Sequence, residues 1–260
     1  MVYKINLKGH DLRRSIFRIF SLEYFLDSFI SKTNMLVEVK KWDDPFENFI
    51  VKLPHQKADG TVSRIENTGY FGQCWTLNCE TDFMWRVYTS DKENVKVKSS
   101  IKKLISSIES APEYKLYKTK SEKSIEGYKS GERYVLIFDC SVGLLKYLPV
   151  NEFRRLNNSR KLKDVYFEDP LFIKRMEFTN EKEVRIILHY WDSDLIGIPD
   201  LDDHFSYKID PNFLFDEIVF DPRIHKKKFQ AYKDYLVVNG FKNPIRQSNL
   251  YRLPFKYIKT

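Results

Sequence analysis

The sequence lacks the motifs that mark most common enzyme classes. It contains no Gly-rich phosphate-binding loop, no G-x-S-x-G nucleophile motif and no kinase or zinc signature. Its three cysteines, Cys74, Cys79 and Cys140, have no metal-type spacing, and its five histidines lie far apart. We therefore expect no metal site. An odd number of cysteines is typical of a protein that keeps reduced thiols, so we expect a cytoplasmic location.

Long hydrophobic runs and flexible linkers are also missing. No run approaches the roughly 20 apolar residues of a membrane helix, and the N-terminus has no signal-peptide core. Nine Gly and ten Pro among 260 residues leave little room for linkers, whereas 42% hydrophobic and 15% aromatic residues provide a substantial core. We expect a single domain over residues 1–260 with no membrane partner.

Positive charge is present in excess and is unevenly placed. The net charge is +8, with a basic run at 154–163, a Lys cluster at 226–228 and no acid after Asp234. Residues 113–131 are also Lys-rich, with interleaved tyrosines, and could form a hairpin or a lid. Such surfaces concentrate nucleic acids or acidic partners, and they also keep a protein soluble. Both explanations are open.

Hydrophobic periodicity predicts many short strands with interspersed helices. We expect strands at 14–20, 35–39, 70–76, 94–98, 173–176, 178–188, 205–209 and 214–220, and two more at 133–139 and 144–148, paired through a turn at Gly143. We expect helices at 21–30, 81–88, 100–107, 151–158 and 224–239. The fold class is therefore α+β, with a twisted and mostly antiparallel sheet.

One predicted strand, at 178–188, carries a pattern of charges. Read with period two, it places Glu181, Glu183 and Arg185 on one face. Two carboxylates and a guanidinium in a cleft would perturb each other's pKa values and could stabilise a developing cation. The same pattern also fits a solvated face with an ordinary ion pair. This strand alone does not decide between them.

Other residues are placed unusually in their predicted elements. Arg18 lies between Ile16 and Phe20 on one strand face, an odd place for a merely solvating charge. Trp85 and Tyr88 adjoin on a predicted helix, where aromatic pairs form either core or a ligand platform.

A resemblance joins these stretches. The chain looks like a widespread bacterial family of domains of unknown function, over about residues 16–252. The matching motifs are Arg18-Ile19, Trp42-Asp43-Asp44-Pro45-Phe46-Glu47, Cys74-Trp75-Thr76, Met84-Trp85-x-x-Tyr88, Lys174-Arg175, Glu181-x-Glu183-x-Arg185, Ile218-Val219-x-Asp221-Pro222 and Ser248-x-Leu250-Tyr251.

The order of Arg18, Thr76 and Glu181-x-Glu183 is also similar to the R-S-E pattern of ADP-ribosyltransferases. That resemblance implies two small, mostly antiparallel sheets with NAD bound in the cleft between them. It assigns Arg18 to the NAD phosphates, Thr76 to the ribose region, Glu183 to catalysis and Glu181 to an accessory role. Thr76 departs from the family, in which Ser is commoner at this position.

The resemblance also implies further contacts to NAD. Trp85 and Tyr88 are the candidates for stacking on nicotinamide, and Trp75 and Arg185 are further candidate NAD-binding residues.

The chemistry is physically consistent. Cleavage of the N-glycosidic bond of NAD passes through an oxocarbenium-like state, which a fixed carboxylate stabilises. A second carboxylate could deprotonate the nucleophile, and an arginine flanked by apolar side chains suits a bidentate grip on pyrophosphate.

We therefore expect an ADP-ribosyltransferase with NAD as co-substrate and no metal. We expect it to act as a toxin or phage-defence effector. Its acceptor would be nucleic acid (RNA or DNA) or protein, and its partner would be a neutralising antitoxin. The alternatives are a non-enzymatic nucleic-acid-binding module and an NAD glycohydrolase.

Overall fold

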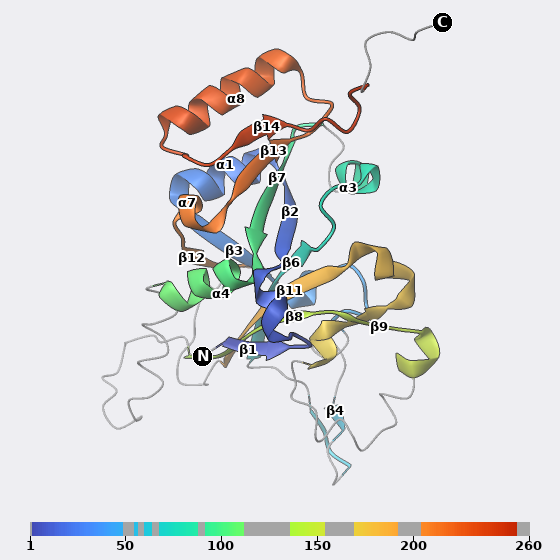
Figure 1. Cartoon of the computed structure of the whole chain (residues 1–260). Helices are drawn as coiled ribbons and strands as arrows, with labels where there is room; N and C mark the ends of the chain where they lie inside the picture. Colours follow the sequence, from blue (N-terminus) through green and yellow to red (C-terminus); the bar gives the residue numbers. More distant parts are fainter. Residues whose placement is uncertain are drawn as a thin grey trace, which may run out of the picture.

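A large, mostly antiparallel sheet forms the body of the protein (Figure 1). The computed structural model describes residues 2–48, 55–56, 60–63, 68–87, 92–111, 136–153, 169–191 and 204–253. The 10-stranded sheet has the order β1-β8-β11-β6-β2-β7-β13-β14, with β3 joining β6 to β12, and two-stranded sheets pair β9 with β10 and β4 with β5. With its interspersed helices, the chain has the expected α+β class.

The strands have the following bounds: β1 (Val2–Ile5), β2 (Ser15–Ser21), β3 (Thr33–Glu38), β4 (His55–Gln56), β5 (Val62–Ser63), β6 (Thr68–Thr76), β7 (Asn94–Ser100), β8 (Leu136–Leu144), β9 (Lys146–Leu148), β10 (Ile173–Arg175), β11 (Glu183–Trp191), β12 (His204–Lys208), β13 (Glu217–Phe220) and β14 (Ile245–Gln247). The helices are α1 (Leu22–Ser31), α3 (Asp82–Val87), α4 (Ile101–Ser110), α7 (Pro211–Leu214) and α8 (Lys226–Val238), with 3-10 turns η1 (Gly9–Arg13), η2 (Val39–Lys41), η4 (Asp169–Phe172) and η5 (Met176–Glu181).

A narrow junction divides the large sheet into two halves. Strands β2 and β6 are joined by one residue pair, Phe17 with Thr76. On one side lie β1, β8, β11, β6, β3 and β12, and on the other lie β2, β7, β13 and β14. These halves correspond to the two small sheets that we expected.

The junction opens a gap along one edge of β6. Strand β3 pairs with β6 at Gly72 and Phe71, whereas β2 meets β6 at Thr76. Helix α1 connects β2 to β3 along the chain, and the two strands pair with β6 at positions four residues apart or more. Side chains of β2, β3 and β6 near this divergence line a cavity.

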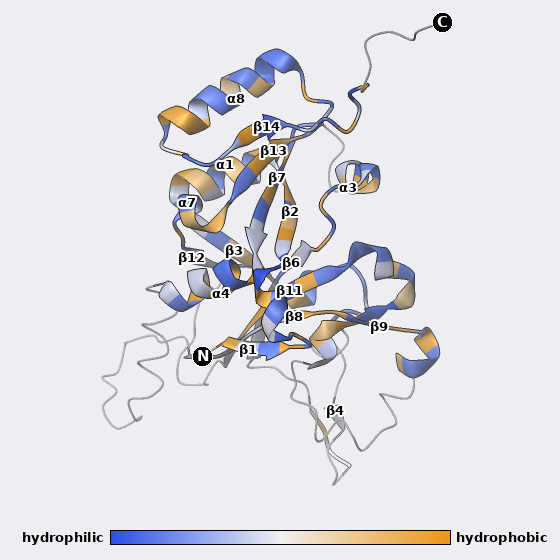
Figure 2. Cartoon of the chain, in the orientation of Figure 1, coloured by the Kyte–Doolittle hydropathy of each residue, from blue (hydrophilic) through white to orange (hydrophobic). Residues whose placement is uncertain are grey.

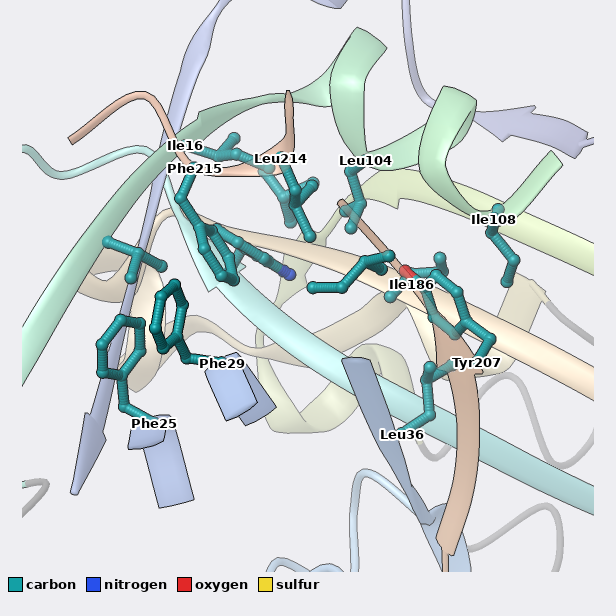
Figure 3. Packing of buried hydrophobic residues seen from close by; sticks show 14 of the residues in the cluster. Ile16, Phe25, Phe29, Leu36, Leu104, Ile108, Ile186, Tyr207, Leu214 and Phe215 are labelled. Carbon is teal, nitrogen blue, oxygen red and sulfur yellow. The ribbon is translucent and has the colours of Figure 1, made fainter. Parts of the chain in front are cut away.

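Hydrophobic packing holds the helices against the sheet. The side chain of Ser21 caps α1 by accepting a hydrogen bond from the Tyr24 N–H at 3.3 Å. Figure 3 shows Phe25 and Phe29 of α1 beside Phe215, and Leu104 of α4 above Ile186 of β11. All five side chains are buried. Colouring by hydropathy shows apolar segments on β2, β7 and β13, whereas α8 is largely polar (Figure 2).

Strand β11 is buried on both faces, and its first residue differs from the sequence prediction. It begins at Glu183 rather than near 178, so Glu181 lies in η5 and not on the strand. Lys182 separates them in a left-handed conformation with φ 45°. From Glu183 to Leu188 every residue is buried, because β6 and β8 pair along both edges of β11 and packed layers cover its two faces. A solvated outer face is therefore excluded.

Two other predicted elements differ from the structure. Gly143 lies inside the continuous strand β8 and not in a turn between two paired strands. The predicted strand at 214–220 is divided between α7 and β13. The Lys-rich segment 113–131, Tyr88 and most of the predicted basic helix at 151–158 lie outside the described residues.

Gly143 permits the pairing of β1 with β8. A Cβ atom at this position would meet the backbone carbonyl oxygen of Ile5 and lie 2.7 Å from the Ile5 Cβ. We expect Gly143→Ala to displace β1 and lower the free energy of unfolding by about 1–3 kcal/mol, the usual cost of overpacking. Gly9→Ala, which would add a methyl group where nothing lies within 4 Å, is the control. Equal urea midpoints for the two variants would contradict this prediction.

Within the described part of the chain, no helix is long and apolar enough to cross a membrane.

Candidate functional site

Five of the sequence-predicted residues lie around one cavity at the junction of the half-sheets. This carboxylate cavity has a volume of about 290 Å³ and is lined in part by Arg18, Trp75, Thr76, Glu181 and Glu183. Arg18 comes from β2, Trp75 and Thr76 from β6, and the two carboxylates from η5 and β11. Residues far apart in the sequence thus converge because β6 pairs with both β11 and β2.

Glu183 is held in one orientation by two cations. Its side chain is 5% exposed, and its carboxylate accepts hydrogen bonds from Arg185 Nε at 2.7 Å and Lys174 Nζ at 3.1 Å. The Glu183 backbone N–H donates to the Tyr147 hydroxyl at 2.8 Å. A carboxylate fixed in this way needs little reorganisation to face a developing positive charge.

Arg185 supports Glu183 from behind the cavity. It is 0% exposed, and its guanidinium lies 4.5 Å from the centre of the Trp42 ring. It donates to the Leu171 carbonyl at 2.6 Å and also pairs with Glu47. Burial works against its charge, but Glu183 and the other nearby anions outweigh burial and raise the pKa of Arg185. Arg185 is not among the residues that line the cavity.

Lys174 connects the carboxylates. Its Nζ lies 2.9 Å from Glu47, 2.5 Å from Glu181 and 3.1 Å from Glu183. Burial disfavours the charged amine, but Glu183 and Glu47 reverse this effect and raise its pKa. With Arg185, the cluster holds three carboxylates and two cations. Arg18, which lines the same cavity, supplies a third cation next to the cluster.

The two cavity carboxylates have pKa values displaced in opposite directions. Burial alone would raise the pKa of Glu183, but Arg185 and Lys174 lower it below its ordinary value of 4.5. Burial raises the pKa of Glu181, and Lys174 only partly offsets the increase. The side chain of Glu181 is also more accessible, at 25% exposed. Such a pair can divide the roles of fixed anion and proton acceptor.

Thr76 ties the end of β6 to the segment that carries Glu181. Its hydroxyl donates to the Glu181 carbonyl at 2.5 Å and accepts from the Asn78 N–H at 3.0 Å. The hydroxyl therefore positions the backbone just before Glu183, in addition to lining the cavity.

Trp75 forms a rigid wall of the cavity. Its indole N–H donates to Gln73 at 2.7 Å, and Gln73 donates to Asn34 at 2.7 Å. Asn34 in turn donates to the Tyr207 hydroxyl at 2.8 Å. This buried chain of hydrogen bonds fixes the indole, because each buried polar group would be costly without its partner.

Trp85, another predicted contact of nicotinamide, is not among the residues that line the cavity. Trp85 is 0% exposed, and its indole N–H donates to Glu80 at 2.8 Å. Its neighbour Met84 lines the cavity instead. Tyr88 lies outside the described residues.

Sequence reasoning did not assign Lys174 or Glu47 to the site. Both were visible as parts of motifs, Lys174-Arg175 and the 42–47 segment, but nothing in either motif specifies a partner. Glu47 reaches Arg185 because Trp42 of the same segment packs over β6 and over the Arg185 guanidinium. Gly72 leaves room for that indole, since a Cβ there would overlap Trp42.

We expect the two carboxylates to contribute to acid stability with opposite signs. The lowered pKa of Glu183 stabilises the fold above about pH 4.5, and this contribution is lost as the pH falls through the folded-state pKa. The raised pKa of Glu181 has the opposite effect, because folding favours its protonated form. This contribution to stability is complete below about pH 4.5 and is lost as the pH rises through the folded-state pKa. Unfolding free energy measured by urea titration between about pH 3 and pH 6 should therefore rise less in Glu183→Gln than in wild type, and more in Glu181→Gln. The same slope in both variants would contradict these assignments.

No protein-family model matches the chain, and no curated protein matches it at significant similarity. Among solved structures, Thermus sp. 2.9 DarT in complex with carba-NAD+ is similar over 91% of this chain and 96% of that chain, with 9% identity and a TM-score of 0.33. The complexes with NAD+ and with ADP-ribosylated ssDNA each have 8% identity and a TM-score of 0.34, and cover 91% and 95% of this chain and 96% and 97% of theirs. Likeness at this level adds no weight to a function, which rests on the residues of the cleft.

In the described residues, no group of three or more His, Cys, Asp or Glu side chains is arranged to hold a metal ion.

Proposed function

We propose that the protein is an NAD-dependent ADP-ribosyltransferase. The observation that carries the proposal is the convergence of Arg18, Glu181 and Glu183 on one cavity where the half-sheets diverge. A guanidinium beside two carboxylates with opposed pKa displacements suits a substrate that combines a pyrophosphate with a cationic leaving group.

We assign Glu183 to cleavage of the bond between the ribose C1′ and the nicotinamide nitrogen. Its ionised carboxylate would face the nicotinamide ribose and stabilise the positive charge that develops at C1′ as the bond to nicotinamide nitrogen lengthens. The bonding electrons leave with nicotinamide, which departs neutral. Lys174 and Arg185 keep Glu183 ionised and oriented throughout.

We assign Glu181 to deprotonation of the acceptor. The acceptor atom attacks C1′, and its proton passes to a carboxylate whose raised pKa makes it a better base than Glu183. Arg18 would hold the pyrophosphate and Thr76 would order the ribose region. Trp75 would form the wall of the cavity next to the nicotinamide. Trp85 and Tyr88 stay predictions as nicotinamide contacts, with Met84 taking the cavity position next to Trp85.

Nucleic acid is the acceptor that charge favours. Lys226 and Lys227 are exposed at the start of α8 and would attract a polyanion, whereas the neighbouring Lys228 pairs with Glu93. RNA, DNA and a protein acceptor each remain within the proposal. The proposal also includes a role as a cytoplasmic toxin or phage-defence effector, with a neutralising antitoxin as its partner.

Two other functions fit particular observations. An NAD glycohydrolase would use the same cavity with water as acceptor. A non-enzymatic nucleic-acid-binding module would need only the basic surface, with the buried ion cluster serving stability.

Incubation with NAD labelled in its adenylate portion separates the three. The full chain is incubated with the labelled NAD alone, and with the labelled NAD together with RNA, single-stranded DNA or cell extract. Label on a macromolecule supports transfer, whereas free ADP-ribose in every arm indicates the glycohydrolase. Intact NAD in every arm, with salt-sensitive retention of nucleic acid, would overturn the proposal in favour of binding.

A further inference from the structure

A second and larger cavity adjoins the carboxylate cavity. This α1 cavity has a volume of about 510 Å³ and lies among α1, β2, β3 and β12. Both cavities are lined by Arg18, Ile19 and Val37, so they meet at Arg18. A ligand with a pyrophosphate at its centre could therefore place one half in each cavity.

One polar face of helix α1 lines this second cavity. The lining residues Tyr24, Asp27, Ser28 and Ser31 follow the spacing of neighbours on one helix face. The opposite face buries Leu22, Phe25 and Phe29 in the core. The helix thus has an anchored apolar face, and its polar face is free to meet a ligand.

The two serine hydroxyl groups on this face already form hydrogen bonds within the protein. Ser28 Oγ donates to the Thr33 carbonyl at 2.5 Å, and Ser31 Oγ donates to the Asp27 carbonyl at 2.6 Å. Within the described part of the chain, the Asp27 carboxylate forms no ion pair. Tyr24 and Asp27 are therefore the groups on this face that are available to a ligand.

The opposite side of the α1 cavity is apolar. Met35 and Val37 of β3 provide a surface for a planar base, and Phe20 of β2 lines the cavity beside them with the Arg18 guanidinium 4.3 Å from the centre of its ring. Tyr24, which is 64% exposed at the rim of the cavity, adds a second surface on which a base can stack. An apolar floor, an aromatic rim and one carboxylate together suit a nucleoside with free ribose hydroxyls.

We infer, on the basis of the proposed function, that the α1 cavity takes the adenosine half of NAD and that Asp27 reads the ribose 2′-hydroxyl. A carboxylate accepts hydrogen bonds from a ribose diol, whereas it repels a 2′-phosphate. Asp27 therefore makes the chain selective for NAD over NADP. Glu23, one turn earlier on the same helix, is exposed and lies outside the cavity lining.

Binding of ADP-ribose and of its 2′-phosphate tests this assignment without turnover, because neither carries a nicotinamide to release. Calorimetric titration of the full wild-type chain is expected to give at least about tenfold tighter binding of ADP-ribose, the ratio that 1.4 kcal/mol of discrimination produces. Asp27→Asn should reduce that ratio about tenfold, mainly through tighter binding of the 2′-phosphate. Glu23→Gln, which removes the same charge from the same helix, should leave the ratio unchanged.

Four outcomes would overturn the inference. Equal affinities in wild type, or a ratio that Asp27→Asn leaves unchanged, would reject the role of Asp27 while leaving the proposed function intact. Failure of wild type to bind either probe would reject both. Competition of ADP-ribose with a single-stranded oligonucleotide, but not with adenosine, would instead assign the α1 cavity to the acceptor.

Discussion

Glu183→Gln is expected to abolish both ADP-ribosyl transfer and NAD hydrolysis, with kcat reduced at least about 100-fold. The amide keeps the shape of the side chain but removes the charge that would stabilise the oxocarbenium-like state. ADP-ribose binding should change by no more than a few-fold, because Arg18 and the α1 cavity are untouched. Nicotinamide release at saturating NAD measures the loss.

The control for this prediction is Glu177→Gln. Glu177 lies exposed on η5, and its substitution removes the same charge a few residues away from Glu183. Circular dichroism should first show that both variants are folded. If Glu183→Gln then kept the wild-type rate, the assignment of Glu183 to catalysis would be wrong.

Arg185→Met is expected to produce the largest loss of stability, about 3–5 kcal/mol. Methionine fills part of the space but leaves Glu183 and Glu47 buried with Lys174 as their main cation. Removing one partner of a buried ion pair leaves an uncompensated charge, which costs far more than the pair contributes. Urea-induced unfolding at neutral pH measures the change.

Arg246→Met provides a matched control. Arg246 pairs with Glu217 at 2.7 Å, but its side chain is 42% exposed, so its loss should cost no more than about 1 kcal/mol. In the double variant with Glu183→Gln, part of the Arg185→Met loss should be recovered, a coupling of about 0.5–3 kcal/mol. Equal costs for Arg185→Met and Arg246→Met, or strict additivity, would contradict the description of a coupled buried cluster.

Local patterns predicted the elements around the cleft. Ser21 before an apolar stripe predicted α1, and the alternation around Arg18 predicted β2, because caps and periodicity are properties of neighbouring residues. The same reasoning placed Glu181 on a strand, since period two cannot reveal the left-handed Lys182 that separates η5 from β11. Both carboxylates still reach the cavity.

Burial depended on contacts that no local pattern contains. Helix α3 has six residues with apolar side chains on several faces, so its orientation is set by contacts from distant segments. Arg223 donates to the Trp85 carbonyl, and Ser248 donates to Glu80, which accepts from the Trp85 indole. Phe83 is consequently exposed while Trp85 is buried. Lys174 and Glu47 join the cluster for the same reason, because their positions follow from tertiary packing.

The central claim is that Arg18 and Glu183 serve one bound dinucleotide. A crystal structure of the protein with a non-hydrolysable NAD analogue tests it most directly. The account predicts the pyrophosphate at Arg18, the nicotinamide ribose within about 3 Å of the Glu183 carboxylate and the adenosine against Tyr24 and Asp27. An analogue bound away from the two cavities, or with its ribose out of reach of Glu183, would contradict it.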